Sequence, residues 1–200
     1  MWRIGSTARL LFIAALGLVA PACGTAKYMK EMPAGSALQA PGPGKAMVVF
    51  MRSSLLSKAA AASIFELKNN DPKLVGMVAN DTKLAYEADP GKCLFMVVSG
   101  SADYMWADLA ANRTYYVFVT PRMGAFRARF FLTAVSRSGD RSSDARECLK
   151  DCRLVARTPA AESWASENMS DIRAKHRENY PRWNQKPDNE KAHLAREDGV

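Results

Sequence analysis

Downstream of residue 45, hydrophobic residues occur in short segments that are separated by turn-forming residues. Residues 46–51 and 93–99 are almost entirely apolar, as strands in the interior of a sheet are, whereas residues 103–109 and 126–134 alternate between apolar and polar positions. Eight candidate strands follow from these patterns: residues 46–51, 63–68, 74–79, 84–87, 93–99, 103–109, 114–120 and 126–134.

Turn residues support the same reading. The sequence Asn-Asn-Asp-Pro occupies residues 69–72, and Asp-Pro-Gly-Lys at residues 89–92 has proline to preset φ and glycine for a left-handed position. No helical pattern between residues 46 and 135 is long enough for the crossovers of a parallel sheet. The sequence therefore predicts a mainly β fold, an antiparallel β-sandwich of about 7–8 strands with a C-terminal helical extension.

The pattern changes after residue 135. Residues 144–151 favour one or two helical turns, and residues 153–157 favour a final edge strand. Thr158 and Pro159 then predict the start of a longer helix, because threonine is a good N-cap and proline is tolerated at the first helical position. This helix carries an apolar stripe at helical spacing: Ala161, Trp164, Ala165, Met169 and Ile172.

Such a stripe must be buried, and the sheet is the nearest surface that can bury it. Tyr180 and Pro181 are expected to end the helix, and Pro187 is expected to open a shorter one that continues to about Arg196.

The first 22 residues have the three parts of a secretion signal. Arg3 and Arg9 form a positive region, residues 10–20 form an apolar region, and small residues precede Cys23. The apolar stretch is shorter than the about 20 residues that a permanent membrane-spanning helix needs. The small residues before Cys23 resemble the lipobox of bacterial lipoproteins, which implies cleavage before Cys23 and acylation of that cysteine. Ordinary signal peptidase would cut the same bond and release a secreted protein, so both outcomes stay open.

These features divide the chain into four parts. Residues 1–22 are the predicted signal peptide, and residues 23–45, rich in proline and glycine, are a predicted flexible tether. Residues 46–157 are the predicted β-sandwich domain, and residues 158–200 are the predicted helical extension.

The formal net charge is +8, and removal of the two leader arginines leaves +6. A basic surface favours polyanions, although dispersed acids also fit simple solubility. Arg127 and Arg129, on the polar face of a predicted strand, are the candidate polyanion-binding residues. In an exported protein the expected partners are membrane lipid through acylated Cys23 and an envelope protein or anionic glycan, not nucleic acid.

The remaining candidates for chemistry are few. If Cys23 carries lipid, Cys93, Cys148 and Cys152 remain, so at most one intramolecular disulfide can form, and inert thiols are the alternative. The only histidines, His176 and His193, lie in the helical tail without the partners that metal or triad chemistry needs. No catalytic residue, metal site or cofactor is predicted.

Asp103 and Asp108 are five residues apart on one predicted strand and therefore face opposite sides of it, so they form no carboxylate pair.

A family resemblance rests on one stretch of the chain. The turn at residues 89–92, the core strand Cys-Leu-Phe-Met-Val-Val at 93–98 and Trp-Ala-Asp-Leu-Ala-Ala-Asn-Arg-Thr-Tyr-Tyr-Val at 106–117 resemble small bacterial envelope lipoproteins. Their domain is similar to PEGA-type and transthyretin-like β-sandwiches, and the similarity covers roughly residues 45–135. It implies a sandwich without enzymatic activity and carries over no catalytic residue.

We therefore expect a non-enzymatic binding or assembly module, anchored in the cell envelope. The alternatives are a structural accessory subunit that docks through its C-terminal helices, and an enzyme.

Overall fold

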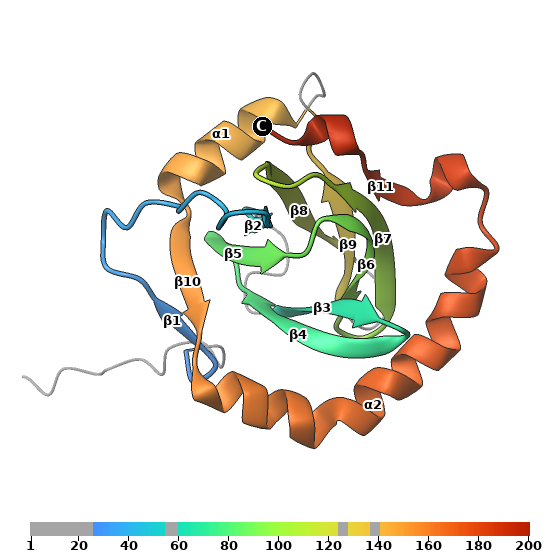
Figure 1. Ribbon diagram of the computed structural model, residues 1–200. Helices are drawn as coiled ribbons and strands as arrows, with labels where there is room; N and C mark the ends of the chain where they lie inside the picture. Colours follow the sequence, from blue (N-terminus) through green and yellow to red (C-terminus); the bar gives the residue numbers. More distant parts are fainter. Residues whose placement is uncertain (1–25, 55–59, 124–127, 137–140) are drawn as a thin grey trace, which may run out of the picture.

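The computed structural model describes residues 26–54, 60–123, 128–136 and 141–200 (Figure 1). Within them, two β-sheets pack face to face, and a long helix follows near the C-terminus. The predicted mainly β, sandwich-like fold with a C-terminal helix is confirmed. The predicted signal peptide and Cys23 lie outside the described residues.

The first sheet has six strands in the order β1-β10-β5-β2-β8-β9. Their bounds are β1 Met29–Glu31, β10 Arg153–Arg157, β5 Thr82–Ala88, β2 Ala46–Arg52, β8 Thr114–Met123 and β9 Ala128–Ala134. The second sheet has five strands in the order β11-β7-β6-β3-β4. Their bounds are β11 Ala192–Leu194, β7 Ala102–Leu109, β6 Gly91–Val98, β3 Ala62–Lys68 and β4 Asp71–Val78.

The sequence predicted an antiparallel sandwich, but not every pair of neighbouring strands in the structure is antiparallel. Neighbours along the chain, such as β3 with β4 and β6 with β7, do pair antiparallel. The pairs β2–β8, β5–β10 and β7–β11 are parallel. The strands of each parallel pair are far apart in the sequence, so a tight hairpin does not impose their direction.

The main core lies between the two sheets. Phe50 of β2 and Phe95 of β6 meet edge to face at 5.2 Å between ring centroids, and both are fully buried. Each sheet also has a covered outer face: helix α1 (Ser142–Asp151) packs on Met47, Val49 and Phe118 of the first sheet. Helix α2 (Pro159–Asn184) packs on the outer face of the second (Figure 1). Each sheet is thus apolar on both faces along part of its length, which explains the continuous apolar runs in the sequence.

Helix α2 extends beyond the predicted end. The prediction that Tyr180 and Pro181 end the helix is wrong, because α2 continues to Asn184 with Pro181 inside it. Proline removes one backbone hydrogen bond from a helix, but the following turn places Trp183 in a buried cluster with Tyr104 and Tyr180. Burial of a tryptophan there offsets the lost hydrogen bond.

The chain after α2 also differs from the prediction of a second helix from Pro187. It forms two short 3-10 helices, η1 (Asp188–Glu190) and η2 (Arg196–Asp198), on either side of β11. Leu194 of β11 is fully buried in the main core. The expected helix is therefore replaced by the three-residue strand β11, which pairs with β7 at the edge of the second sheet.

The segment predicted as a flexible tether is partly built into the first sheet. Met29–Glu31 pairs with β10, and Met29 is 6% exposed within the main core. As a result β10, predicted as an edge strand, lies between β1 and β5. The tether prediction is wrong for this part of residues 23–45.

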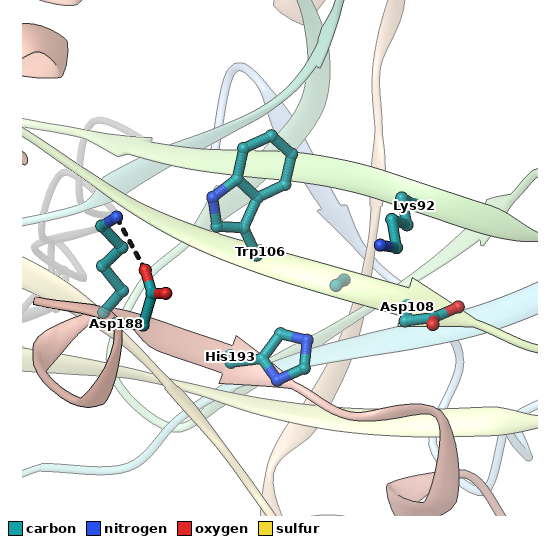
Figure 2. Close-up of a pocket in the computed structure, with 7 residues that line it drawn as sticks. Lys92, Trp106, Asp108, Asp188 and His193 are labelled. Carbon is teal, nitrogen blue, oxygen red and sulfur yellow. Dashed lines mark hydrogen bonds and ion pairs between the residues drawn. The ribbon is translucent and has the colours of Figure 1, made fainter. Parts of the chain in front are cut away.

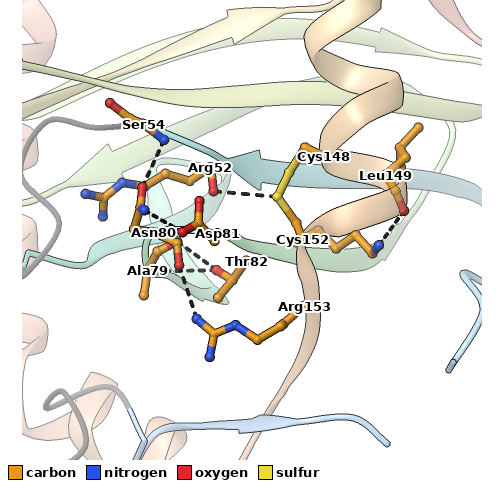
Figure 3. Close-up of a disulfide and its surroundings, with 11 residues drawn as sticks. Arg52, Ser54, Ala79, Asn80, Asp81, Thr82, Cys148, Leu149, Cys152 and Arg153 are labelled. Carbon is orange, nitrogen blue, oxygen red and sulfur yellow. Dashed lines mark hydrogen bonds between the residues drawn. A yellow bond between two sulfur atoms is a disulfide. The ribbon is translucent and has the colours of Figure 1, made fainter. Parts of the chain in front are cut away.

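A disulfide joins Cys148 in the last turn of α1 to Cys152, directly before β10 (Figure 3). The Sγ of Cys152 also lies 3.9 Å from the backbone oxygen of Arg52 on β2. Of the pairings that the sequence left open, the structure contains the short bridge within the C-terminal part. Cys93, half-buried on β6, is free.

Candidate functional site

The outer face of the second sheet is covered at one end and open at the other. Along β7, Tyr104, Trp106 and Asp108 point to this face, and Met105 and Ala107 point into the main core. Tyr104 is fully buried under α2, beside His176, Tyr180 and Trp183. Trp106, two residues further along, is 36% exposed.

A cavity of about 520 Å³ opens over this uncovered end of the sheet (Figure 2). It is lined by Lys92 of β6, by residues 106–108 of β7, by His193 of β11, and by Asp188 and Lys191. In Figure 2 the indole of Trp106 stands in the middle, with Asp188 on one side and Lys92 and Asp108 on the other. The cavity volume lies within the range of small-molecule sites in proteins.

Strand pairing fixes the neighbours of Trp106. In the antiparallel pair β6–β7, Trp106 lies opposite Leu94, and in the parallel pair β7–β11 it lies beside His193. Both neighbours point to the same face as Trp106, because the positions on either side of each enter the main core. The indole is therefore flanked by a buried leucine and by the exposed imidazole of His193.

Ion pairs hold the two acidic residues of the cavity. The Nζ of Lys191 lies 3.0 Å from the carboxylate of Asp188, and the same amine lies 5.9 Å above the ring of Trp183. A guanidinium nitrogen of Arg196 lies 3.4 Å from the carboxylate of Asp108. Lys191 is largely covered, but Asp188 and Arg196 are exposed and Asp108 is partly exposed, so these ion pairs contribute more to positioning than to stability.

Lys92 differs from these four residues. It is exposed on β6 directly opposite Asp108 in the strand register, and no residue of the described chain forms an ion pair with it. The cavity thus combines the indole of Trp106, the carboxylates of Asp108 and Asp188, which already have partners, and the amine of Lys92, whose charge no described residue neutralises.

This arrangement suits a ligand with an apolar face and a polar rim. An aromatic ring attracts C–H groups through its electron-rich face, and a pyranose ring presents such groups on one side and hydroxyls around its edge. Asp108, Asp188 and His193 supply acceptors, and Lys92 and Lys191 supply donors, around the indole.

A second cleft, of about 460 Å³, lies between β9 and α2. Arg129 of β9 lines it together with Lys175, Arg182 and Lys186. Burial raises the pKa of Asp103 in the same cleft to about 6, against the opposing effect of the nearby Lys186 charge.

The structure separates the residues that the sequence proposed as sites. Arg129 is exposed at the edge of the first sheet, whereas Cys23 and Arg127 lie outside the described residues. Asp103 lies on the side of β7 that carries Met105 and Ala107, and Asp108 lies on the side that carries Tyr104 and Trp106, so the prediction that they face opposite sides is confirmed. His176 lies on α2 itself and is buried against Tyr104 of the second sheet.

The sequence pattern did not identify Trp106, Lys92 and His193 as members of one site. The alternation along residues 103–109 did place Trp106 on the face opposite Met105, which was the available signal. His193 could not be joined to it, because its segment was predicted as a helix and not as a strand beside β7.

No protein family and no curated protein matches this chain. In the described ranges there is no cluster of three or more His, Cys, Asp or Glu side chains arranged to hold a metal ion. Helices of the described part are either too short or too polar to cross a bilayer.

Proposed function

We propose that this chain is a membrane-anchored binding module of the bacterial cell envelope that holds a saccharide against Trp106. The observation that carries the proposal is the exposed indole in a cavity ringed by hydrogen-bonding side chains (Figure 2). The role is binding and not catalysis, with Asp108 and Asp188 acting as acceptors that Arg196 and Lys191 hold in place.

The place of Trp106 supports the proposal more than its exposure does. A single exposed apolar side chain is ordinary on a protein surface, but Trp106 lines a cavity, and tryptophan is enriched where one molecule recognises another. Met32 and Val200 are the other large hydrophobic side chains of the described residues that are strongly exposed, and neither lines this cavity.

The proposed location follows from the N-terminal sequence. A positive region, an apolar region and small residues before Cys23 are the pattern of an exported lipoprotein, and saccharide polymers are abundant ligands in the envelope. The resemblance of residues 45–135 to envelope lipoproteins supports the same location.

Saccharide binding is preferred over docking through the C-terminal helix. The apolar side chains of α2, including Ala161, Ala165 and Ile172, are already buried against the second sheet. The face of α2 that remains exposed is polar and charged, which gives a docking partner little apolar surface to bury.

The binding test is a titration of the full chain with a β-1,4-linked trisaccharide of glucose, followed through the indole N–H resonances in NMR spectra. We expect the resonance of Trp106, assigned by its loss in Trp106→Phe, to shift with saturation. Trp106→Ala should abolish binding by a chain that still folds, which its melting curve checks, because Trp106 is 36% exposed and lies outside the main core.

The matched control is Met32→Ala, which removes another exposed large apolar side chain outside the cavity and should bind normally. If no β-linked saccharide of glucose or N-acetylglucosamine perturbs Trp106, or if Trp106→Ala binds as the wild type does, the proposal is wrong.

The proposed location has its own test. Mass spectrometry of protein recovered from host membranes should find an N-terminal peptide that begins at Cys23 and carries acyl chains. Recovery from the cytosol with Met1 in place and a bare thiol on Cys23 would contradict the anchoring proposal and leave the saccharide proposal standing.

A further inference from the structure

We propose that the Trp106 site selects acidic saccharides, and that Lys92 binds the carboxylate of the sugar that stacks on Trp106. This inference rests on the proposed function and specifies its ligand class. It comes from the distribution of charge around the cavity, which is independent of the exposed indole.

Among the described residues, every charged side chain around the cavity has a partner except Lys92. Asp188 is 3.0 Å from Lys191, and Asp108 is 3.4 Å from Arg196. Lys92, which forms no ion pair within the described residues, leaves the group with one unneutralised positive charge. A bound carboxylate would neutralise that charge, whereas a neutral sugar would leave it unpaired.

Strand geometry places Lys92 at a suitable distance from the aromatic surface. Trp106 lies opposite Leu94, and Lys92 is two residues from Leu94 on the same face of β6. Such a diagonal pair of cross-strand positions is separated by about 7–8 Å, which the flexible lysine side chain can shorten. A hexose whose ring lies on the indole can therefore extend an exocyclic carboxylate to the Lys92 amine.

The pairing of Asp108 explains why Lys92 stays available. Asp108 is the cross-strand partner of Lys92, and opposite charges at that position would usually attract each other. Arg196 from η2 contacts Asp108 instead. Figure 2 shows Lys92 and Asp108 on one side of Trp106 and Asp188 on the other.

The second cleft is the competing location for an acidic ligand, since it is lined by four cationic side chains: Arg129, Lys175, Arg182 and Lys186. It also contains Asp103, Asp171 and Glu178, which oppose an anion. Its tryptophan, Trp183, is 4% exposed and packed against Tyr104, so it offers no surface on which a sugar ring can stack. Only the Trp106 cavity combines an accessible indole with a free cation among the described clefts.

The test compares two ligands that differ only in the acid. One is the β-1,4-linked glucose trisaccharide, and the other is the same trisaccharide with its C6 hydroxymethyl groups oxidised to carboxylates. We expect the acidic trisaccharide to bind about tenfold more tightly at low ionic strength, as one charge-assisted hydrogen bond allows. The preference should shrink as salt is raised, because the site is open to solvent.

Three variants of the full chain separate the outcomes. Lys92→Gln should bind both trisaccharides equally and at the affinity of the wild type for the neutral one. Arg129→Gln, the matched control in the second cleft, should keep the full preference. Trp106→Ala should lose both ligands.

Equal binding of the two trisaccharides by the wild type would overturn the inference and leave saccharide binding intact. The same holds if Arg129→Gln, and not Lys92→Gln, removes the preference. Failure of both ligands to bind the wild type would overturn the proposed function itself.

Discussion

The hydroxyl of Tyr104 lies 3.1 Å from Nδ1 of His176, in a contact that joins the second sheet to the helix covering it. Both side chains are buried, and the ring of Tyr180 lies against each of them. Burial lowers the pKa of His176, and the neighbouring Arg177 charge lowers it further. The attachment of α2 therefore depends on a histidine that is neutral in the folded protein.

This relationship predicts that acid weakens the fold. Because the pKa of His176 is lower in the folded than in the unfolded chain, its contribution to stability is present above about pH 6.5 and is lost as pH falls through the folded value. With Asp103, whose titration opposes that of His176, replaced by asparagine, urea unfolding from pH 7.5 to pH 5 should show a falling free energy of unfolding, and His176→Gln should reduce that fall. His193→Gln, at an exposed histidine, is the control and should behave as the wild type.

Asp103 predicts the opposite dependence on pH. Burial raises the pKa of Asp103 to about 6, so the folded state binds the proton more tightly than the unfolded state. Its stabilising contribution is complete below about pH 4 and is lost as pH rises through 6. Asp103→Asn should therefore raise the free energy of unfolding by about 1–2 kcal/mol at pH 7.5 and change nothing near pH 4.

Urea titrations of Asp103→Asn at these two pH values check the prediction, and an equal effect at both would contradict it. The His176 measurement is best made in the Asp103→Asn background, where the two titrations no longer offset each other.

Glu66 is a buried carboxylate that depends on Tyr86. It is 2% exposed in the main core, and the Tyr86 hydroxyl donates a hydrogen bond of 2.6 Å to its Oε2. Tyr86→Phe should lower the free energy of unfolding by about 1–3 kcal/mol, because it leaves the carboxylate with an unsatisfied oxygen. The measurement is urea unfolding at pH 7.

Glu66→Gln keeps an oxygen that can accept from Tyr86, so it should cost less than Tyr86→Phe. The Nζ of Lys68 lies 3.7 Å from the Glu66 carboxylate. A larger loss of stability from Glu66→Gln than from Tyr86→Phe would show that the negative charge of Glu66 contributes more than its hydrogen bond with Tyr86.

The disulfide predicts a modest dependence on redox conditions. Cys148 and Cys152 close a loop of only a few residues, for which the chain-entropy estimate gives about 2 kcal/mol. Replacement of both cysteines by alanine should lower the free energy of unfolding by about that amount at pH 7, measured by urea unfolding. Cys93→Ala, at the free cysteine, should not abolish the effect of a reducing agent, whereas the double variant should.

Local patterns predicted the strands whose neighbours in space are also neighbours in sequence. The alternation of residues 103–109 identified β7 and placed Trp106 outward, and the turn at residues 89–92 identified the start of β6. The parallel pairing of β2 with β8 could not be predicted, because no local signal links segments so far apart.

Tertiary contacts determined the rest. Pro181 is a helix breaker by propensity, yet Trp183 packs against Tyr104 and the helix continues. β11 has three residues, too few to show a strand period, and its place is fixed by burial of Leu194. Whether the Trp106 site is open to solvent depends on where α2 ends, and the sequence pattern predicted that end at the wrong residue.

The burial of Met29 limits the distance that could separate the folded domain from a membrane that holds Cys23. If Cys23 is acylated, only the five residues 24–28 lie between the acylated cysteine and β1, which allows a reach of about 20 Å at full extension. A flexible tether from Cys23 to Ala46 would have allowed a reach of about 80 Å at full extension. β1 and β11 occupy the outer edges of opposite sheets, and in Figure 1 they lie on opposite sides of the molecule. A bilayer that holds an acylated Cys23 would thus lie near the β1 edge, and Trp106, whose strand β7 pairs with β11, would lie toward the opposite edge.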